Sequence, residues 1–438
     1  MRPARLSESA ATERRASVTA KFSHLPLRPM EADAIPLGTK ARRLHRRIVL
    51  ADHSVKGLCR LVDQFAIRPV LSILRIIPLI IRLGPKARRE CGVPIRRQLR
   101  DMLRFVLIHG GKPWIYYVTE RYRSGGMAEA GALLMRNEMK NGLWRALNLI
   151  DAEARPLRRN LREKDKAAEW FVENNLPHPR TLMLVDRGNV VWQGGPLSDL
   201  DQDLFVKLRD SRGAKRTAGY RRIAAFEYLD DHHRPINLAQ IIVELLRRSR
   251  RESLLVQPLL HNHPAIADLT GDSLITLRLV TCLNEQLRPT LTMAYFRSVA
   301  KLELRWELGR IQEFASTIDF ETGALGRMTS DKADSLSEWD DRHPITGAMA
   351  TGRIVPFWQE TVELVIRAHS LLPGRVVVGW DVAVTEDGPM LLEGNSFPDN
   401  IYPQRLYQKP MGHLRFGELL SFHFDRIEAE LDTGRKLT

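Results

Sequence analysis

The sequence predicts an α+β fold, because helices and strands follow one another without the regular strand–helix–strand repeat of a parallel sheet. Residues from about 36 to 145 are basic, show apolar residues at helical spacing and contain few strand signals. From about Leu161 the chain alternates between helical segments and β-branched runs, and an apolar hairpin lies near its end. We therefore expect a mostly helical N-terminal region followed by a mixed domain.

Length and charge bound the protein class. With 438 residues, the chain can bury a large core and should form about two or three subdomains. Its composition, 44% hydrophobic and 27% charged, is typical of a soluble globular protein. The net charge of +15 predicts an acidic partner, which can be nucleic acid, anionic lipid or a phosphorylated ligand. No aromatic–basic platform or helix-turn-helix pattern favours nucleic acid among the three.

The first 35 residues are rich in Arg, Ala and Ser, which predicts a disordered tail. A transit peptide is the alternative, and Glu8, Glu13 and Glu31 disfavour it. The three cysteines are too widely spaced for a disulfide framework or a zinc site, so a reducing cytoplasm fits best.

One segment, Pro69 to Leu83, resembles a membrane element. Arg75 and Pro78 interrupt it, and it is too short to span a bilayer. With basic residues on both sides it can lie in an anionic interface, at the inner surface of a membrane. The alternative is an amphipathic core helix of the N-terminal region.

The periodicity also places the individual elements. Helices are expected at Ile95–His109, Met127–Leu149, Lys164–Asn175, Leu238–Arg248 and Pro356–Ser370. Strands are expected at Thr181–Val185, Leu204–Lys207, Tyr220–Tyr228, Ser253–Leu259, Ser273–Leu283 and Thr290–Arg297, with a turn region at Trp192–Gly195.

Two apolar runs flank Glu386-Asp387-Gly388, which predicts a hairpin. A three-residue loop with Gly388 in the left-handed conformation would pair Thr385 with Pro389 and Asp381 with Glu393. Asn395 would then lie on the same face, two residues along the strand. A two-residue loop at Asp387-Gly388 would instead separate Asp381 from the other two. We expect the first register.

Oxygen-bearing side chains in such apolar strands need compensation. An unpaired buried carboxylate costs several kcal/mol. Asp381, Glu393 and Asn395 together offer the oxygen donors that Mg²⁺ (or Mn²⁺) prefers, so we expect a metal site formed by these three residues. A hairpin with a few solvated acids is the alternative.

A strand ending in Lys207 leads into a polar loop that contains Ser211, Gly213 and Lys215. Backbone N–H groups of such a loop, together with lysines, can bind phosphates, although the Walker spacing is absent. Lys166, at the start of the preceding helix, is a further candidate. The alternatives are a solvated basic loop and an ordinary surface lysine.

Arg278 is a charge in a strand otherwise suited to burial, so it needs an anionic partner. That partner can be a transferring phosphoryl group or a structural carboxylate. Gln257 follows the apolar run Leu254–Val256, and Pro258 ends the strand, which suits a linker whose backbone could pair with an adenine edge. His261 and His263 have no nearby third ligand and are expected in an ordinary loop.

Several enzyme classes lack support. The chain shows no nucleophile elbow, no H-E-x-x-H sequence and no dinucleotide-binding fingerprint.

The order of these parts resembles the ATP-grasp superfamily, most closely its sugar-transfer-associated group, which is related to glutamate-ligase-like carboxylate–amine ligases. The resemblance covers roughly residues 145 to 420. The residues that carry it are Asp165-Lys166, Phe205–Lys207, Gln257–Pro264, Thr276–Arg278, His343–Gly347, Pro356–Trp358, Gly379–Asp381 and Glu393–Asn395.

The resemblance implies a two-lobed fold in which two antiparallel sheets hold ATP between them. The domain would span residues 146–430, with a nucleotide-binding lobe at about 160–256 and a metal-binding lobe at about 257–430. The implied roles are phosphate binding by Lys166, Lys207 and the 211–219 loop, adenine binding near Gln257, Mg²⁺ binding by Asp381, Glu393 and Asn395, and stabilisation of the transferred phosphoryl group by Arg278.

The implied activity is that of a carboxylate–amine ligase. Such an enzyme uses ATP to convert a carboxylate into an acyl phosphate, which an amine then attacks. The group name implies sugar or cell-surface polysaccharide modification, and small-molecule carboxylates and amines as partners. A second hypothesis is a catalytically weakened nucleotide-binding protein that assists envelope assembly at the membrane surface. It is motivated by Pro69–Leu83 and by the charged, helix-like segment Lys301–Phe314, where the group is expected to show a polar, Gly-rich stretch.

Overall fold

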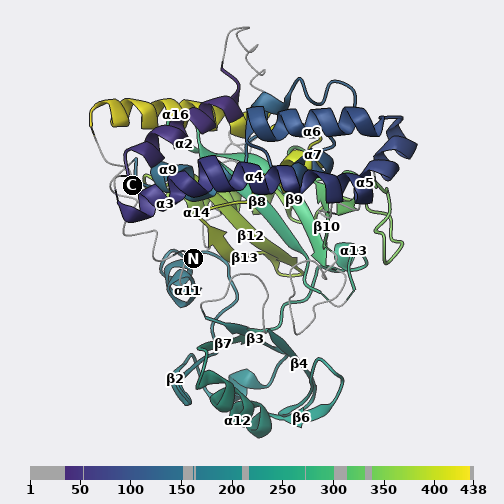
Figure 1. The fold of residues 1–438 in the computed structure, drawn as a ribbon. Coiled ribbons are helices and arrows are strands. Elements are labelled where there is room, and N and C mark those ends of the chain that lie inside the picture. Colours follow the sequence, from purple (N-terminus) through teal and green to yellow (C-terminus); the bar gives the residue numbers. More distant parts are fainter. Residues whose placement is uncertain are drawn as a thin grey trace, which may run out of the picture. The chain divides into compact units, whose positions relative to one another are not determined.

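The computed structural model describes residues 35–52, 54–150, 161, 164–209, 217–271, 273–299, 313–330 and 338–434. The expected tail therefore falls, apart from its last residue, outside the described residues. The same holds for the 210–216 part of the phosphate loop and for residues 301–312. Two antiparallel sheets combine with helices, and the N-terminal region is helical, which confirms the predicted α+β fold (Figure 1).

The N-terminal region is built from α-helices joined by short turns. They are α2 (Leu37–Leu50), α3 (Val55–Val62), α4 (Arg68–Leu74), α5 (Ile76–Cys91), α6 (Ile95–His109) and α7 (Pro113–Val118), with a π-helical turn, η1 (Asp63–Ile67), between α3 and α4. The predicted helix at Ile95–His109 is confirmed. It begins after Pro94 and ends at Gly110, whose φ of 62° stops the helix in the left-handed conformation.

The predicted long helix at Met127–Leu149 is confirmed only in part, because helical turns run from Arg136 to Leu147 with a kink at Gly142. This stretch forms four short helical pieces, namely η2 (Ala130–Ala132), α8 (Arg136–Glu138), η3 (Met139–Leu143) and α9 (Trp144–Leu147). Gly142 has a non-helical φ of 177° within η3. The apolar spacing is nearly helical, but glycines in this stretch let the backbone depart from helical geometry.

A seven-stranded sheet has the order β2-β1-β7-β3-β4-β5-β6. Its strands are β1 (Met183–Asp186), β2 (Asn189–Gln193), β3 (Leu204–Leu208), β4 (Ala218–Ala224), β5 (Glu227–Leu229), β6 (Pro235–Asn237) and β7 (Leu254–Pro258). Helix α12 (Leu238–Ser249) packs against β1, β2 and β7. A capping box between Asn237 and Gln240 fixes the start of this helix.

Two predictions in this sheet need correction. The expected turn region Trp192–Gly195 begins inside strand β2, which pairs with β1. The expected single strand Tyr220–Tyr228 is two strands, β4 and β5, joined by a turn in which Phe226 has a φ of 57°. Apolar content alone did not reveal strand β2 or the turn between β4 and β5.

A six-stranded sheet has the order β11-β10-β9-β8-β12-β13. Its strands are β8 (Thr276–Leu283), β9 (Pro289–Val299), β10 (Glu313–Thr317), β11 (Thr329–Ser330), β12 (Val377–Thr385) and β13 (Gly388–Asn395). The remaining named helices are α11 (Lys164–Glu173), η4 (Leu197–Leu200), α13 (Pro264–Ala267), α14 (Trp358–Ser370), α15 (Tyr402–Leu406), η5 (Met411–His413) and α16 (Arg415–Asp432).

The two faces of the six-stranded sheet bury different cores. On one face Leu279, Phe296 and Trp380 belong to a cluster that includes Val365 of α14. Side chains alternate between faces along a strand, so Val280 points the other way, into a second cluster with residues of α2, α9 and α16. The N-terminal helices and the sheet thus share a core. The half-buried charged residues Arg278 and Asp381 lie on the same strands, β8 and β12.

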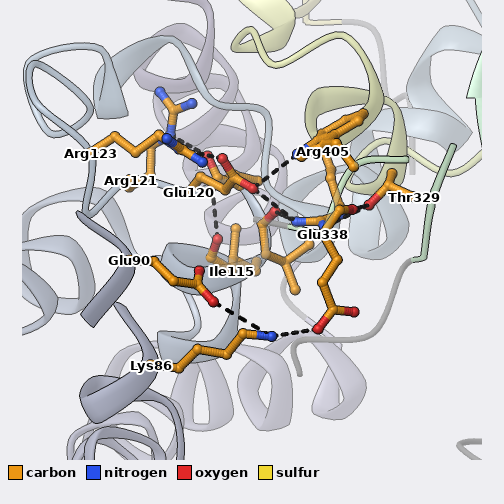
Figure 2. A network of polar contacts seen from close by, with 12 residues as sticks. Lys86, Glu90, Ile115, Glu120, Arg121, Arg123, Thr329, Glu338 and Arg405 are labelled. Carbon is orange, nitrogen blue, oxygen red and sulfur yellow. Dashed lines mark hydrogen bonds and ion pairs between the residues drawn. The ribbon is translucent and has the colours of Figure 1, made fainter. Parts of the chain in front are cut away.

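A polar network joins the N-terminal helices to the end of the chain (Figure 2). Arg405 of α15 is fully buried and donates hydrogen bonds to the Val118 carbonyl at 3.0 Å and to Thr329 Oγ1 at 2.7 Å. Its guanidinium lies 3.5 Å from the Glu120 carboxylate and 5.4 Å from the centre of the Trp339 ring. Charge, hydrogen bonding and stacking therefore fix this arginine from three directions.

We predict that Arg405→Met destabilises the protein strongly. The substitution leaves the buried Glu120 with a weakened set of partners, and breaking a buried ion pair costs about 3–5 kcal/mol. Arg415→Met is the matched control. Arg415 is 35% exposed and pairs with Glu285 and Glu418, so its loss should cost about 1 kcal/mol or less. Urea unfolding of both variants measures the difference, and equal effects would contradict the assigned importance of the network.

Candidate functional site

Polar side chains line up across four neighbouring strands at one end of the six-stranded sheet. Asp381 on β12 lies opposite Glu393 on β13 and, on its other side, opposite Arg278 on β8. Arg278 lies in turn opposite Tyr295 on β9. Residues opposite each other on antiparallel strands project from the same face at close range, so the sheet itself brings these groups together.

The pairing of Asp381 with Glu393 is the predicted one, but the hairpin reaches it differently. Thr385 pairs with Gly388 and not with Pro389, so the loop is the two residues Glu386 and Asp387. The shift of one residue is undone by an irregularity in the register between Asp381 and Val382. Gly388 has a φ of 114°, a conformation that strongly favours glycine.

Asp381 is held from two sides. Arg278 Nη2 donates to Asp381 Oδ2 at 2.9 Å, and Arg278 Nε donates to the other carboxylate oxygen. Asn395 Nδ2 lies 3.4 Å from Asp381 Oδ2. Burial lowers the pKa of Arg278, but the charge and hydrogen bond of Asp381 together with Tyr295 outweigh it, and the net shift is upward. The structural ion pair expected as one reading of Arg278 is therefore present.

Glu393 is in a less compensated position. Burial and the nearby Asp381 carboxylate raise its pKa, while the charges of Lys164, Arg278 and Lys207 oppose that rise only in part. The ionised pair of carboxylates thus retains unfavourable electrostatic energy in the folded protein. A further cation at this place would relieve it.

Lys207 brings a positive charge from the other sheet. It lies on β3, opposite Leu255 of β7. Burial and the neighbouring Lys164 lower its pKa to about 8, and the Glu393 carboxylate opposes both. The ammonium group is therefore within electrostatic reach of Glu393 and incompletely compensated, a state that suits a site for anionic phosphates.

The sequence did not identify Lys164. This residue opens α11, donates to the Leu208 carbonyl at 3.2 Å, and is the lysine of that helix whose charge acts on both Lys207 and Glu393. Its neighbour Asp165 pairs with Arg209 at 2.6 Å, which also ties α11 to the end of β3. The sequence Lys164-Asp-Lys166 indicated a lysine at the start of α11, but helical spacing could not show whether Lys164 or Lys166 acts on Lys207 and Glu393. The role of Lys166 stays a prediction.

A second ion pair on the same sheet was also missed. Arg297 Nε donates to Glu313 Oε1 at 2.5 Å, and the two side chains are 24% and 13% exposed. Burial lowers the pKa of Arg297, but Glu313 raises it to well above its usual value. A charge within the apolar run Tyr295-Phe-Arg297 is the same signal that identified Arg278.

The other predicted nucleotide-binding residues are less well defined. Gln257 lies on β7, is 5% exposed, and donates from Nε2 to the Pro179 carbonyl at 2.9 Å. Its side-chain amide is thus committed within the protein, and contact with adenine stays a prediction. Ser211, Gly213 and Lys215 lie outside the described residues.

The donor set suits a hard divalent cation. Among the described residues, no group of three His, Cys, Asp or Glu side chains is placed to hold a metal ion, so the site depends on Asn395 as a third donor. Two carboxylates and an amide supply only oxygen ligands, which Mg²⁺ and Mn²⁺ prefer. The hydrogen bonds from Arg278 leave lone pairs of Asp381 available for a metal ion, because a carboxylate offers about four lone-pair sites.

The two antiparallel sheets and the polar groups between them define an ATP-grasp protein. A family model described as sugar-transfer associated ATP-grasp matches residues 160–413. The chain belongs to this family. The comparison with curated proteins finds no match.

Solved structures show only a distant likeness. D-alanyl-alanine synthetase A from Vibrio cholerae is 14% identical, with a TM-score of 0.33 over 62% of this chain and 66% of that one. The VanG D-Ala:D-Ser ligase from Enterococcus faecalis is 11% identical, with a TM-score of 0.34 over 62% and 61%. N5-carboxyaminoimidazole synthase from Aspergillus clavatus is 14% identical, with a TM-score of 0.30 over 54% and 44%. This chain spans less than two thirds of each of these structures, and similarity this low does not extend to function.

We predict that Glu393→Gln stabilises the metal-free protein at neutral pH. A glutamate whose pKa is raised by folding favours the folded state when protonated and loses that contribution as the pH rises through its folded pKa. The gain in melting temperature should therefore be present at pH 7.5 and shrink toward pH 4. Glu313→Gln is the control, because it removes the partner of Arg297 and should cost about 3 kcal/mol or more. A loss of stability in Glu393→Gln at pH 7.5 would refute the electrostatic account of the site.

Proposed function

We propose that the protein is an ATP-dependent carboxylate–amine ligase that uses Mg²⁺ or Mn²⁺. The observation that supports this most is the convergence of Asp381, Glu393 and Asn395 beside Arg278 and Lys207. Membership of the ATP-grasp family supports the same conclusion. The arrangement supplies oxygen donors for a divalent cation and cationic groups for phosphates, and phosphoryl transfer asks a protein mainly for those.

The proposed roles follow from position. Lys207, with Lys164 or Lys166 on α11, binds the phosphates of ATP, and Ser211, Gly213 and Lys215 belong to the loop that closes over them. Gln257 lies near adenine. Asp381, Glu393 and Asn395 would hold the cation, and Arg278 neutralises charge on the transferred phosphoryl group. A bound Mg²⁺ would offset phosphate charge and align the phosphate oxygens. The mechanism requires these side chains only to position and neutralise the reacting groups, because no side chain acts as a covalent nucleophile.

The proposed reaction has two steps. A carboxylate oxygen of the first substrate attacks the γ-phosphorus of ATP, the bond to the β–γ bridging oxygen breaks, and ADP leaves. The nitrogen of the second substrate then attacks the carbonyl carbon of the acyl phosphate, loses a proton and expels phosphate, which gives an amide. Burial of the reacting groups protects the acyl phosphate from water.

The family name associates such proteins with sugar transfer, which supports a substrate in sugar or cell-surface polysaccharide modification. A second candidate keeps the nucleotide site without turnover, as a catalytically weakened partner in envelope assembly. The ion pair between Arg278 and Asp381 favours this candidate, because Arg278 occupies part of a carboxylate that is a proposed metal ligand. Turnover measurements separate the two.

We predict ATP turnover by the purified protein when pools of amino acids, sugar acids and amines are supplied with Mg²⁺. Asp381→Asn and Glu393→Gln should each reduce this turnover roughly 100-fold or more, because removing an electrostatic group at the transferred phosphoryl costs about that much. Asp387→Asn is the matched control in the exposed turn of the same hairpin and should retain full activity. ADP release and product masses are the measurements. Full activity in both site variants would refute the assignment, and nucleotide binding without turnover would favour the second candidate.

We predict that affinity for Mg-ATP falls as the pH rises above about 8. Lys207 loses its proton through this range, because burial has lowered its pKa to about 8. The neutral amine then contributes no charge toward the phosphates, which weakens binding roughly tenfold. Bound phosphates favour the charged form and move the decline to higher pH. Lys207→Arg keeps its charge and should show a flat profile between pH 7 and 9.5 in titration calorimetry. The same decline in that variant would assign the pH dependence to another group.

A further inference from the structure

The helices α3, α4 and α5 expose a continuous row of apolar side chains. Val55 is 80% exposed, Leu74 is 65% exposed and Ile81 is 71% exposed. Together with five further exposed residues they recur three to five positions apart, which places them on one side of the helices. We call this row the apolar stripe, and its members are Val55, Leu58, Val62, Phe65, Val70, Leu74, Ile77 and Ile81.

The π-helical turn η1 keeps the apolar stripe in line. The single step of five residues, from Phe65 to Val70, spans the end of η1 (Asp63–Ile67). A π-helical turn contains more residues than an α-helical turn, so the longer step returns the next side chain to the same side. The stripe therefore continues through α4 into α5.

The opposite side of α5 is occupied by the protein core. Ile76, Ile80, Leu83 and Ala87 of α5 are buried in a cluster with residues of α6 and α7. Helix α5 is thus anchored on one side and presents its part of the apolar stripe on the other, while Ile73 of α4 packs partly buried against the same cluster. Among the described residues, no single helix could cross a membrane, but Gly57–Leu74 and Ile76–Cys91, bent by 44°, satisfy length and composition together. Crossing would pull the buried residues of α5 out of the core, so an orientation along a surface fits the packing better.

Positive charge accompanies the apolar stripe. Residues 54–94 contain eight Lys or Arg and two Asp or Glu, a net charge of 8 − 2 = +6. Arg68, Arg75, Arg82 and Arg89 recur every seven residues, which is about two helical turns, so they follow the stripe along one side. Arg75, Arg82 and Arg89 are exposed. Arginine guanidinium groups bind phosphates in a bidentate manner, and their long stems can lie on apolar surface.

We propose that the α3–α5 face docks on an anionic lipid bilayer. The apolar stripe enters the boundary between headgroups and acyl chains, and the flanking arginines bind lipid phosphates. The apolar stripe with its flank of regularly spaced arginines suits an anionic bilayer surface better than a protein interface, because charged residues are depleted at the centre of protein interfaces. This docking is independent of the proposed ligase reaction.

Co-sedimentation of the full-length protein with vesicles tests the apolar part of the proposal. Binding to vesicles that contain phosphatidylglycerol should weaken at least roughly tenfold in the double variant Leu74→Glu/Ile81→Glu, because two anionic side chains replace inserted apolar ones. Val243→Glu is the matched control on α12, since Val243 is 65% exposed like Leu74, and it should bind like the unmodified protein. Equal binding by the double variant would overturn the proposal.

The charge of the lipid tests the second part. Vesicles of phosphatidylcholine alone should bind much more weakly, and Arg75→Gln/Arg89→Gln should reduce binding to the anionic vesicles. Arg250→Gln/Arg251→Gln removes two exposed arginines at the end of α12 and should not. Binding to neutral vesicles as strong as to anionic ones, or equal losses in both arginine pairs, would refute specific docking of this face.

Cys59 offers a direct probe of insertion. It is exposed on α3, and Cys282 is buried, so Cys91→Ala leaves Cys59 as the accessible thiol among the described residues. An environment-sensitive dye on Cys59 should shift its emission to the blue when anionic vesicles are added. A dimer in sedimentation velocity that disappears in Leu74→Glu/Ile81→Glu, with no dye response to vesicles, would show instead that a second copy covers the face. ATP turnover in solution should be unchanged in that double variant, so failure of docking and failure of the ligase proposal remain separate results.

Discussion

The juxtaposition of Asp381 and Glu393 is the constraint around which the candidate site is organised. Two carboxylates on opposed strands repel each other, and burial increases the cost because water cannot screen them fully. The fold offsets part of this cost with Arg278 from β8 and with lysines from α11 and β3. The compensation is incomplete, since the pKa of Glu393 remains raised. An incompletely compensated pair of acids beside Lys207, whose pKa is lowered mainly by burial, is unfavourable for the empty protein and would be relieved by a bound cation and phosphates.

This electrostatic arrangement also explains how much of the site the sequence could reveal. Asp381, Glu393 and Arg278 stand out because each is a charge inside a strand otherwise composed of apolar residues, and the pairing follows from the period of two along a strand. The two-residue loop and the register shift between Asp381 and Val382 could not be derived from the sequence. The two changes are each of one residue and cancel, so Asp381 faces Glu393 with or without them. The pairing was predicted correctly even though the predicted loop was wrong.

The contributions of other elements were harder to predict for a different reason. Lys164, and the pair of Arg297 and Glu313, act through contacts between segments that are distant in sequence or separated by a strand. Helical spacing limits which residues share a face but does not say which of two lysines turns toward another sheet. The same applies to Arg405 and Glu120, which are 285 positions apart and meet only because the N-terminal helices pack on the end of the chain. Helix α6, which begins after Pro94 and ends at Gly110, depends on local signals and was predicted correctly.

The distribution of charge bears on the basic character of the whole chain. A net charge of +15 predicts an acidic partner, but the cationic residues in the described part of the chain fall into sets with different surroundings. Lys207, Arg278 and Arg297 are half-buried in the sheets and lie near carboxylates of the protein. The arginines of α5 are exposed beside apolar side chains, and Arg68 of α4 pairs with Asp63. The proposed docking face would hold the protein at its partner without requiring the proposed catalytic groups to move, because α5 is fixed in the core on its other side. The basic excess of the chain is thus divided between half-buried cations near carboxylates and exposed arginines beside apolar side chains, and each set has its own proposed ligand.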